Sequence, residues 1–319
     1  MTSEFSIVIL GAGGMGAAYA SRFYEMDPAY ISFAASGERY QRLKSEGLVV
    51  NKKHYEISVL SPDDPGPAAD LIIVALKHQH LSTALYDLEN RVGDNTVFLS
   101  IMNGLDSEPI IGSIYGDDKV LLATAVGIDA QRTGNNVNYS KGGTIFFGEP
   151  ENTTLTQRVK DIQGILDRAG IAYQTPADMV RVMWWKFMIN VGINQASVVL
   201  SAPYGVFQTS QHAQQIMESA MREVITVANA AGVNLVEKDI EEWYGFMNSL
   251  DPKGKTSMLQ DIEAGRTTEV DIFGGKVIEL GKTYGFQTPI NEVLFHAIKV
   301  IEQRRQPLIT RYQRNSNMN

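Results

Sequence analysis

Three polar residues at four-residue spacing, Lys186, Asn190 and Asn194, stand in the otherwise apolar stretch WWKFMINVGIN. At 3.6 residues per turn, such positions fan across about 80° of one helix face. That face would present one ammonium and two carboxamide groups to a common target. The alternative is an amphipathic helix whose polar residues face solvent, but the remaining face of this helix is also apolar. The pattern therefore indicates a site for a small, oxygen-rich ligand.

A dinucleotide signature opens the chain. The apolar run Phe5–Leu10 predicts a buried parallel strand, and a glycine-rich G-x-G-x-x-G segment follows it directly. In such a segment the first glycine permits a tight turn, the second lets the backbone approach a pyrophosphate, and the third allows close helix–strand packing. The helix that follows would turn its N–H groups toward the phosphates. We interpret this segment as a nucleotide-binding loop formed by Gly11, Ala12, Gly13, Gly14, Met15 and Gly16.

The next predicted strand, Ile31–Ala34, ends about where the ribose of the cofactor should lie. NAD sites usually carry Asp or Glu there, to accept a hydrogen bond from the 2′-hydroxyl. This chain instead has Ser36, with Arg39 and Arg42 close behind, and guanidinium groups favour a 2′-phosphate. Glu38 could take the acidic role from an unusual position. We predict NADPH over NADH, with Ser36 and Arg39 among its contacts.

Composition limits the remaining classes. The 319 residues are 44 % hydrophobic and 20 % charged, which is typical of a soluble globular protein. The net charge of −8 argues against a nucleic-acid partner. The chain has no cysteine, so a thiol nucleophile, a Cys-ligated metal and a disulfide are excluded. No signal or membrane segment is apparent at the N-terminus, so we expect a cytoplasmic protein without membrane contact.

Alternating strand and helix patterns predict two domains. Residues 1–175 are expected to form a Rossmann-like, doubly wound parallel sheet with some added antiparallel strands, and residues 176–319 an all-helical domain. The predicted strands after the first two are Leu71–Ala75, Val97–Ile101, Val120–Val126, Thr144–Phe147 and the edge strand Ile171–Gln174. The predicted helices include Leu81–Leu88, Thr154–Ala169, Ile216–Ala231 and Pro289–Arg305.

Two further candidate residues, Lys77 and Asn103, each follow a predicted strand. Ligands of open α/β sheets lie outside the carboxyl ends of the strands, so these residues converge with the glycine-rich loop. The segment His78-Gln79-His80 raises the question of a metal, but no carboxylate cluster completes a site. We therefore predict no metal.

Five blocks together resemble ketopantoate reductase (2-dehydropantoate 2-reductase), over nearly the whole chain. They are GAGGMG at 11–16, Lys77 after LIIVAL, Met102-Asn103-Gly104, WWKFMINVGIN, and TSMLQDIEAGRTTEVDIFGG at 256–275. The last block resembles the family's substrate loop and helix, with Ser257, Asp261, Gly265, Glu269 and Gly275 at the positions of that pattern. The order and spacing of the blocks are specific in combination, whereas any one alone is not.

The resemblance implies NADPH-dependent reduction of a 2-keto acid to the (R)-2-hydroxy acid, in pantothenate and coenzyme A synthesis. It implies that Lys186 is the general acid and that Glu269 is its partner in the substrate site. It further implies substrate contacts from Asn190, Asn194 and Ser257, and cofactor contacts from Lys77 and Asn103. Two positions depart from the family: Ser36 stands where many members have Arg, and Tyr204 follows Pro203 where some relatives have Asn.

The chemistry agrees with the residue types. Hydride transfer to a ketone places negative charge on its oxygen, and a nearby cationic acid lowers that barrier. Apolar neighbours would lower the pKa of Lys186, whereas Glu269 would raise it, so the net direction stays open. Structural alternatives are a snorkelling surface lysine at Lys186, an ion pair of Glu269 with Arg266, and an N-cap at Ser257.

We expect the site to lie in the cleft between the two domains. Two other functions remain open: a two-domain dehydrogenase with the same layout but another hydroxy acid, and a non-catalytic NADP(H) sensor. A homodimer through the helical domain is a further prediction, because Met-rich helices such as Ile216–Val227 could pack against a partner.

Overall fold

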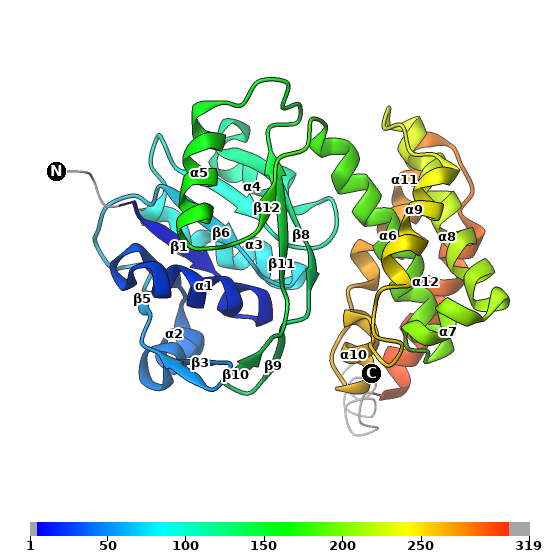
Figure 1. Ribbon diagram of the computed structural model, residues 1–319, viewed down its shortest axis with the longest axis horizontal. Helices are drawn as coiled ribbons and strands as arrows, with labels where there is room; N and C mark the ends of the chain where they lie inside the picture. Colours follow the sequence, from blue (N-terminus) through cyan, green and yellow to red (C-terminus); the bar gives the residue numbers. More distant parts are fainter. Residues whose placement is uncertain (1–4, 306–319) are drawn as a thin grey trace, which may run out of the picture. The chain divides into compact units, whose positions relative to one another are not determined.

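The computed structural model of the chain describes residues 5–305, which form two compact units that divide between Met183 and Trp184. The division lies inside one long helix, α6 (Met179–Leu200), whereas the sequence pattern placed the domain boundary after residue 175. The first unit combines a sheet with helices, and the second consists of helices (Figure 1). The predicted fold class, a Rossmann-like α/β domain followed by a helical domain, is confirmed.

The first unit is built on an eight-stranded sheet with the order β12-β11-β8-β7-β6-β1-β2-β5. The six strands from β8 to β5 in this order run parallel, and β11 pairs antiparallel with β8. The strands β1, β6 and β7 are buried throughout, as expected for central parallel strands with helices on both faces. The bounds are β1 Ile7–Leu10, β2 Ile31–Ala34, β5 Ser58–Leu60, β6 Leu71–Val74, β7 Val97–Ser100, β8 Val120–Ile128, β11 Gly142–Gly148 and β12 Tyr173–Gln174.

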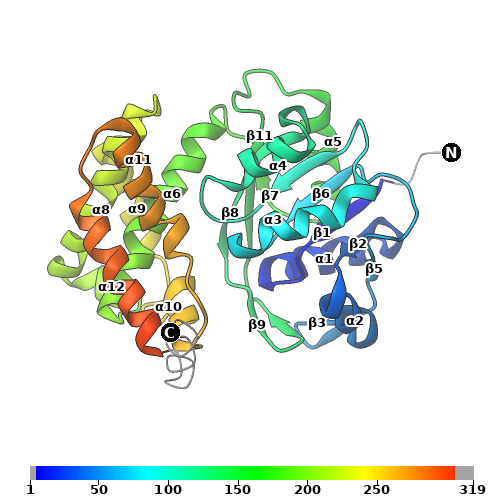
Figure 2. The same cartoon turned by 180° about the vertical axis from the view of Figure 1, so that it is seen from behind.

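Alternation along β1 separates two cores. Ile7 and Ile9 belong to the core that includes Phe23 of helix α1 (Gly14–Met26) and Ile162 of α5 (Gln157–Arg168). Val8 and Leu10 belong to the core on the other face, with side chains of α3 (Leu81–Ala84) and α4 (Ser107–Tyr115). Figure 1 shows α1 and α5 in front of the sheet, and Figure 2, seen from behind, shows α3 and α4. The sheet is therefore doubly wound.

The remaining helical segments of this unit are short, apart from α2 (Gly37–Glu46). The predicted helix Leu81–Leu88 is divided: α3 ends at Ala84, and a 3-10 helix continues over Leu85–Arg91. Three other 3-10 helices lie at Pro28–Tyr30, His78–His80 and Asp117–Lys119.

A second, four-stranded sheet with the order β4-β3-β10-β9 was only partly foreseen, as added strands near the end of the domain. Its strands are three residues each, too short for a reliable alternation pattern, and residues distant in sequence pair within it. The bounds are β3 Leu48–Val50, β4 Lys53–Tyr55, β9 Gln131–Thr133 and β10 Asn136–Asn138.

The second unit, as far as residue 305, contains most of α6 and six further α-helices. Residues 187–198 of α6 are buried except Asn190, so the helix is a central element rather than an amphipathic surface helix. The bounds of the others are α7 Tyr204–Thr209, α8 Gln211–Ala230, α9 Glu237–Met247, α10 Ser257–Glu263, α11 Gly274–Tyr284 and α12 Pro289–Arg305, with a 3-10 helix at Val270–Ile272.

A buried polar network joins three of these helices. Gln195 of α6 donates to Asn291 of α12 at 2.8 Å, and Asn291 donates to Glu223 of α8 at 2.7 Å. Glu223 also accepts hydrogen bonds from the backbone N–H groups of Ile290 and Asn291, at the start of α12. This network fixes how the three helices pack, because a polar group buried here is costly without its partner.

The expectation that the methionines of Ile216–Val227 pack against a partner chain was wrong. Met217 and Met221 are completely buried within their own unit, where they pack in its core. Exposed apolar side chains lie instead on α12, where Val293 is 67 % and Val300 52 % exposed. Within residues 5–305, no helix combines the length and apolar character that a membrane span requires.

Candidate active site

The glycine-rich loop lies where the sequence predicted it, between β1 and α1. Gly11 has φ +115°, and a Cβ at this position would lie 2.5 Å from the carbonyl oxygen of Ala75. A Cβ on Gly16 would overlap the carbonyl oxygen of Gly11. Glycine is therefore required at both positions, the first for the turn and the second for the close approach of helix and loop.

The N-terminus of α1 fits an anionic group. Its N-cap is Gly13, which has no side chain to accept from the first N–H groups, and no acidic residue lies in the first turn. A Cβ on Gly13 would meet only the carbonyl oxygen of Ala75, at 3.7 Å, so this part of the loop is open. Uncapped N–H groups at a helix N-terminus bind phosphate well.

The topology gathers the other predicted cofactor residues at the same edge of the sheet. Strands β7, β6, β1 and β2 are parallel neighbours, so their carboxyl ends lie side by side. Asn103, Lys77, Gly11 and Ser36 follow these four strands in that order. This is the crevice position at which open α/β sheets bind ligands.

A pocket of about 410 Å³ lies at the β2 end of this edge, where Ser36 is one of its lining residues. Its lining residues are Ser36, Glu38, Arg39, Arg42, His80, Thr83, Ala84 and Asp87. The Ser36 hydroxyl donates to the Asp87 carboxylate at 2.9 Å. Burial lowers the pKa of His80, and the positive charges of Arg39 and Lys77 lower it further. The pocket therefore offers cations from one helix and a carboxylate from another segment.

Arg132, which no sequence motif indicated, lies on β9 against the glycine-rich loop. Its guanidinium donates to the carbonyl oxygens of Ala12 and Gly134, the latter at 2.8 Å. Burial lowers the pKa of Arg132, as do the positive charges of Arg42 and Arg39. Three guanidinium groups thus gather beside the loop, and none forms a salt bridge with a residue in the described part of the chain. Only the pairing of the small sheet brings Arg132 here, so no local motif could have indicated it.

In the helical unit, the predicted substrate residues Asn190, Asn194 and Ser257 are connected to one another. The Asn194 amide donates to Asn190 Oδ1 at 3.3 Å and accepts from Ser257 Oγ at 3.4 Å. Its oxygen also accepts from the backbone N–H of Met258 at 3.3 Å. Asn194 is only 4 % exposed, whereas Asn190 is half-buried and Ser257 is exposed, so the set runs from the interior of the unit to its surface. The Asn194 amide and the Ser257 hydroxyl thus bring two donor groups together, and a ligand oxygen could accept from either.

The structure places Lys186 one turn before Asn190 on α6, half-buried, and Glu269 half-buried directly before the 3-10 helix Val270–Ile272. One of the structural alternatives, an N-cap at Ser257, does not hold. Thr256, not Ser257, caps α10, because its hydroxyl accepts from the backbone N–H of Leu259. Arg266 pairs with Asp261 at 2.7 Å.

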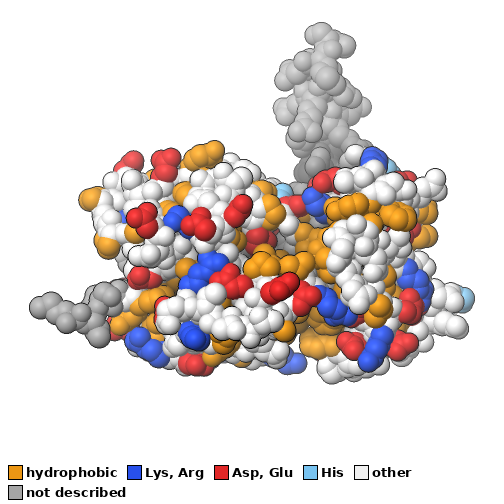
Figure 3. Space-filling view, turned by 90° about the horizontal axis from the view of Figure 1, so that it is seen from above, with side chains coloured by type: hydrophobic (Ala, Val, Ile, Leu, Met, Phe, Trp, Pro, Cys, Tyr) orange, Lys and Arg blue, Asp and Glu red, His pale blue; other side chains and the backbone are white. Residues whose placement is uncertain are grey.

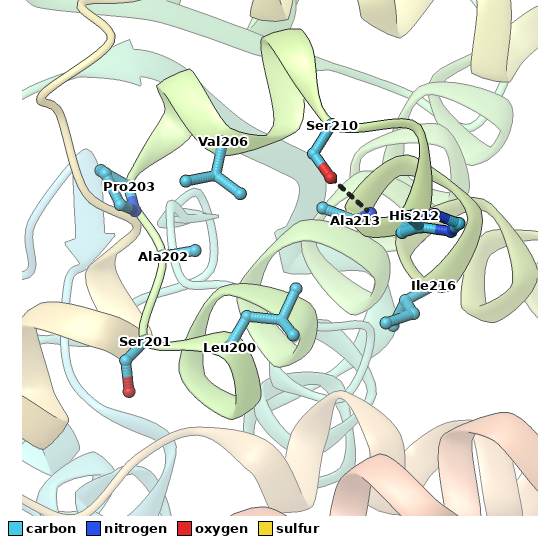
Figure 4. Close-up of a pocket in the computed structure, with 9 residues that line it drawn as sticks. All are labelled: Leu200, Ser201, Ala202, Pro203, Val206, Ser210, His212, Ala213 and Ile216. Carbon is cyan, nitrogen blue, oxygen red and sulfur yellow. Dashed lines mark hydrogen bonds between the residues drawn. The ribbon is translucent and has the colours of Figure 1, made fainter.

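The helical unit has a pocket that contains none of the predicted site residues. It has about 310 Å³ and lies where α6 ends and α7 and α8 begin. Figure 4 shows mostly aliphatic lining residues such as Leu200 and Val206, and none of the predicted residues. Tyr204, next to it in sequence, donates its backbone N–H to Gly254, and burial raises the pKa of its phenol to about 12.

Metal ligands do not gather in the described residues, since no group of three or more His, Asp or Glu side chains there could hold an ion. His78, Gln79 and His80 form a short 3-10 helix, in which Gln79 and His80 contact each other at 3.2 Å. On the face of the molecule in Figure 3, the acidic and basic side chains that are described lie intermingled.

Comparisons with known proteins agree with this arrangement. The family described as "Ketopantoate reductase PanE/ApbA" matches residues 7–152, and its C-terminal counterpart matches residues 178–302. A 2-dehydropantoate 2-reductase of Halobacterium salinarum is 24 % identical over 302 residues, covering 93 % of this chain and 99 % of the relative.

Solved structures show the same fold. A ternary structure of D-mandelate dehydrogenase with NADH and anilino(oxo)acetate has a TM-score of 0.84 at 22 % identity, covering 94 % of this chain and 99 % of that one. A PanE/ApbA family ketopantoate reductase from Ralstonia eutropha JMP134 has a TM-score of 0.81 at 22 % identity, covering 95 % of this chain and all of that one. The chain belongs to the ketopantoate reductase family of oxidoreductases.

Proposed function

We propose that the protein reduces 2-dehydropantoate to (R)-pantoate with NADPH, as in pantothenate and coenzyme A synthesis. The observation that carries this proposal is the hydrogen-bonded set Asn190–Asn194–Ser257, with Lys186 one turn away on the same helix. Amide and hydroxyl groups suit the hydroxyl, carbonyl and carboxylate oxygens of a small keto acid. The curated relative named above carries this same activity in its name.

The first unit would hold the cofactor. Gly11, Gly13, Gly14, Met15 and Gly16 form the loop and first helical turn that fit a diphosphate. Lys77 and Asn103, at the neighbouring strand ends, would contact the nicotinamide half. NADPH supplies the hydride that is transferred to the keto carbon.

NADPH rather than NADH is favoured by the charges around Ser36. Arg39 and Arg42 line the pocket beside it, and Arg132 lies close to both. A 2′-phosphate would neutralise such a group of cations, whereas a 2′-hydroxyl would not. Glu38 and Asp87 line the same pocket and oppose this preference.

Lys186 would act as the general acid. Its ammonium group would stabilise the negative charge that develops on the substrate oxygen and donate a proton to it. Glu269 would hold the ammonium in place and assist its reprotonation, while Asn190, Asn194 and Ser257 would orient the substrate. The proton thus comes from Lys186 Nζ and ends on the new hydroxyl oxygen.

The test is NADPH oxidation, followed by absorbance, with 2-dehydropantoate as substrate. Lys186→Ala is expected to lower kcat by about 10²- to 10⁴-fold, the usual contribution of a general acid. Lys238→Ala, on the exposed surface of α9, is the matched control and should leave kcat unchanged. Equal rates for Lys186→Ala and wild type would refute the assignment. Tight NADPH binding without turnover of any keto acid would favour a cofactor sensor.

A second candidate substrate class is favoured by the similarity to D-mandelate dehydrogenase, an enzyme whose ligand carries an aromatic group. Tyr204 is the residue through which we expect the two classes to differ, because its bulk would restrict the substrate's side chain. A panel of aliphatic and aromatic 2-keto acids, run on wild type and Tyr204→Asn, decides between them. A higher kcat/KM for an aromatic keto acid would move the substrate and retain the mechanism.

A further inference from the structure

A buried carboxyl group lies behind the turn that carries Asn103, and the proposed reaction does not use it. Glu108, in the first turn of α4, is 5 % exposed. An acid in this turn gains from the helix dipole, but burial removes the water that would solvate its charge. Burial raises the pKa of Glu108 to about 7. A carboxyl group buried at this cost is expected to make contacts that offset it.

A chain of hydrogen bonds runs from this carboxyl group to the backbone of the turn. The Ser107 hydroxyl donates to Glu108 Oε2 at 2.9 Å, and the Ser100 hydroxyl donates to Ser107 Oγ at 2.8 Å. The backbone N–H of Met102 donates to Ser100 Oγ at 3.4 Å. All four residues are buried, and every donor points toward Glu108. The carboxyl oxygen therefore determines the orientation of both hydroxyl groups.

The two ends of this chain show what it can do. It starts at an amide N–H, which does not release a proton at neutral pH, so the chain cannot conduct protons. At the other end, Glu108 Oε2 accepts from Ser107, while Oε1 has no hydrogen-bond partner among the described residues. Asp106 is the nearby charge, and it raises the pKa of Glu108 further. Such a chain can order the backbone but cannot supply chemistry.

The backbone that it orders is a tight turn at the end of β7. Ser100 is the last residue of the strand, and Gly104 follows Asn103 with φ +94°. We propose that Glu108 is a positioning residue, which fixes the turn Met102-Asn103-Gly104 through Ser107 and Ser100 and so holds Asn103 toward the nicotinamide end of the cofactor. The contact of Asn103 with the cofactor rests on the proposed function, whereas the ordering of the turn does not.

Amide hydrogen exchange of the cofactor-free protein tests the ordering directly. Glu108→Ala is expected to increase the exchange rate of the Met102 amide about tenfold, because opening of the turn becomes a local event. Ser107→Ala interrupts the same chain with a smaller change in volume, and it should have a similar effect. Glu108→Gln keeps an oxygen acceptor for Ser107 and should exchange like wild type. Ser113→Ala is the matched control, since this exposed serine of α4 bonds only within its own helix.

Kinetics then test the consequence for the reaction. Glu108→Ala and Ser107→Ala should lower kcat about tenfold, while the NADPH dissociation constant from fluorescence titration changes less than about threefold. The double variant Asn103→Ala/Glu108→Ala should have the same kcat as Asn103→Ala alone, because both substitutions act through the Asn103 side chain.

The outcomes separate the two proposals. Unchanged Met102 exchange in folded Glu108→Ala and Ser107→Ala would overturn the positioning role, whatever the activity. Faster exchange in a protein that reduces no keto acid would support the positioning role and refute the proposed function. A Glu108→Gln variant as impaired as Glu108→Ala would also overturn the inference, since it would mean that the charge is what counts.

Discussion

Arg132 leads to a prediction about the choice between NADPH and NADH. Its guanidinium lies near those of Arg39 and Arg42, so a bound phosphate would offset their mutual repulsion. Arg132→Met is therefore expected to raise the KM for NADPH by about tenfold or more, with a smaller effect on NADH. Arg168→Met, which removes a guanidinium stacked on Tyr30, is the control. An equal rise for NADPH and NADH would assign Arg132 to the diphosphate instead.

Glu108 leads to a prediction about stability and pH. Its pKa in the folded protein is about 7, above its ordinary value of 4.5, so the folded state binds the proton more tightly than the unfolded state. The wild type should therefore lose stability relative to Glu108→Gln as the pH rises from about 4.5 to 7, by about 3 kcal/mol in all. Urea unfolding of both proteins at pH 5 and pH 8 measures this difference. A difference that does not change with pH would contradict the prediction.

Residues with a local signature could be predicted, and residues that depend on distant pairing could not. Gly11 and Gly16 are recognisable because each performs its task within the same strand–turn–helix segment. Asn190 and Asn194 are recognisable because helical spacing alone makes them neighbours. Arg132 of β9 lies against the glycine-rich loop, and Asp87 of a 3-10 helix lines the pocket beside Ser36; no sequence motif indicates either position.

At the scale of the helix, two glycines provide a matched test of packing. Gly16→Ala in α1 is expected to displace the glycine-rich loop, because the added methyl group would overlap the Gly11 carbonyl oxygen. NADPH affinity should fall by at least about tenfold. Gly164→Ala in α5 meets nothing within 4 Å and should stabilise the protein by about 0.5–1 kcal/mol. Isothermal titration and thermal unfolding of both variants check this, and normal NADPH affinity in Gly16→Ala would refute it.

The buried network of the helical unit leads to a second prediction at this scale. Asn291→Ala removes the side-chain hydrogen bonds that Asn291 accepts from Gln195 and donates to Glu223, leaves a small cavity, and should destabilise the unit by about 2–4 kcal/mol. Asn248→Ala, at an exposed asparagine that ends α9, should change stability by less than about 0.5 kcal/mol. Urea unfolding followed by circular dichroism compares them. Similar values for the two variants would show that the network does not hold the helices together.

The elements themselves were predictable to different degrees. The helix Pro289–Arg305 was predicted with the bounds that the structure gives, because proline at the first position and a long apolar period mark it. The helix predicted from Ile216 begins at Gln211, since its first turn is polar and is capped by Ser210. The small sheet depends on the pairing of β3 with β10, residues far apart in sequence, and periodicity cannot reveal such pairing.

For the whole molecule, the division into two units makes ligand stabilisation informative. NADPH at 100 times its dissociation constant should stabilise the native protein by about 2.7 kcal/mol. This increment should be the same in wild type and Asn291→Ala, because Asn291 lies outside the unit that carries the glycine-rich loop. At the same NADPH concentration, the stabilisation should be much smaller in Gly16→Ala, because this variant is expected to bind NADPH more weakly. Differential scanning fluorimetry with and without NADPH measures all three, and an increment lost in Asn291→Ala would contradict the assignment of the cofactor to the first unit.

The placement of Ser36, Glu38, Arg39 and Arg42 at the start of α2 has a practical consequence for engineering. One contiguous segment, positions 36–42, carries four of the eight residues that line this pocket. If this pocket holds the 2′ group of the cofactor, as proposed, a library confined to these codons would change the preference between NADPH and NADH and leave the helical unit, with the proposed substrate residues, unchanged. Natural sequence variation at these positions could have the same effect, so that relatives acting on the same substrate could differ in their use of NADPH or NADH.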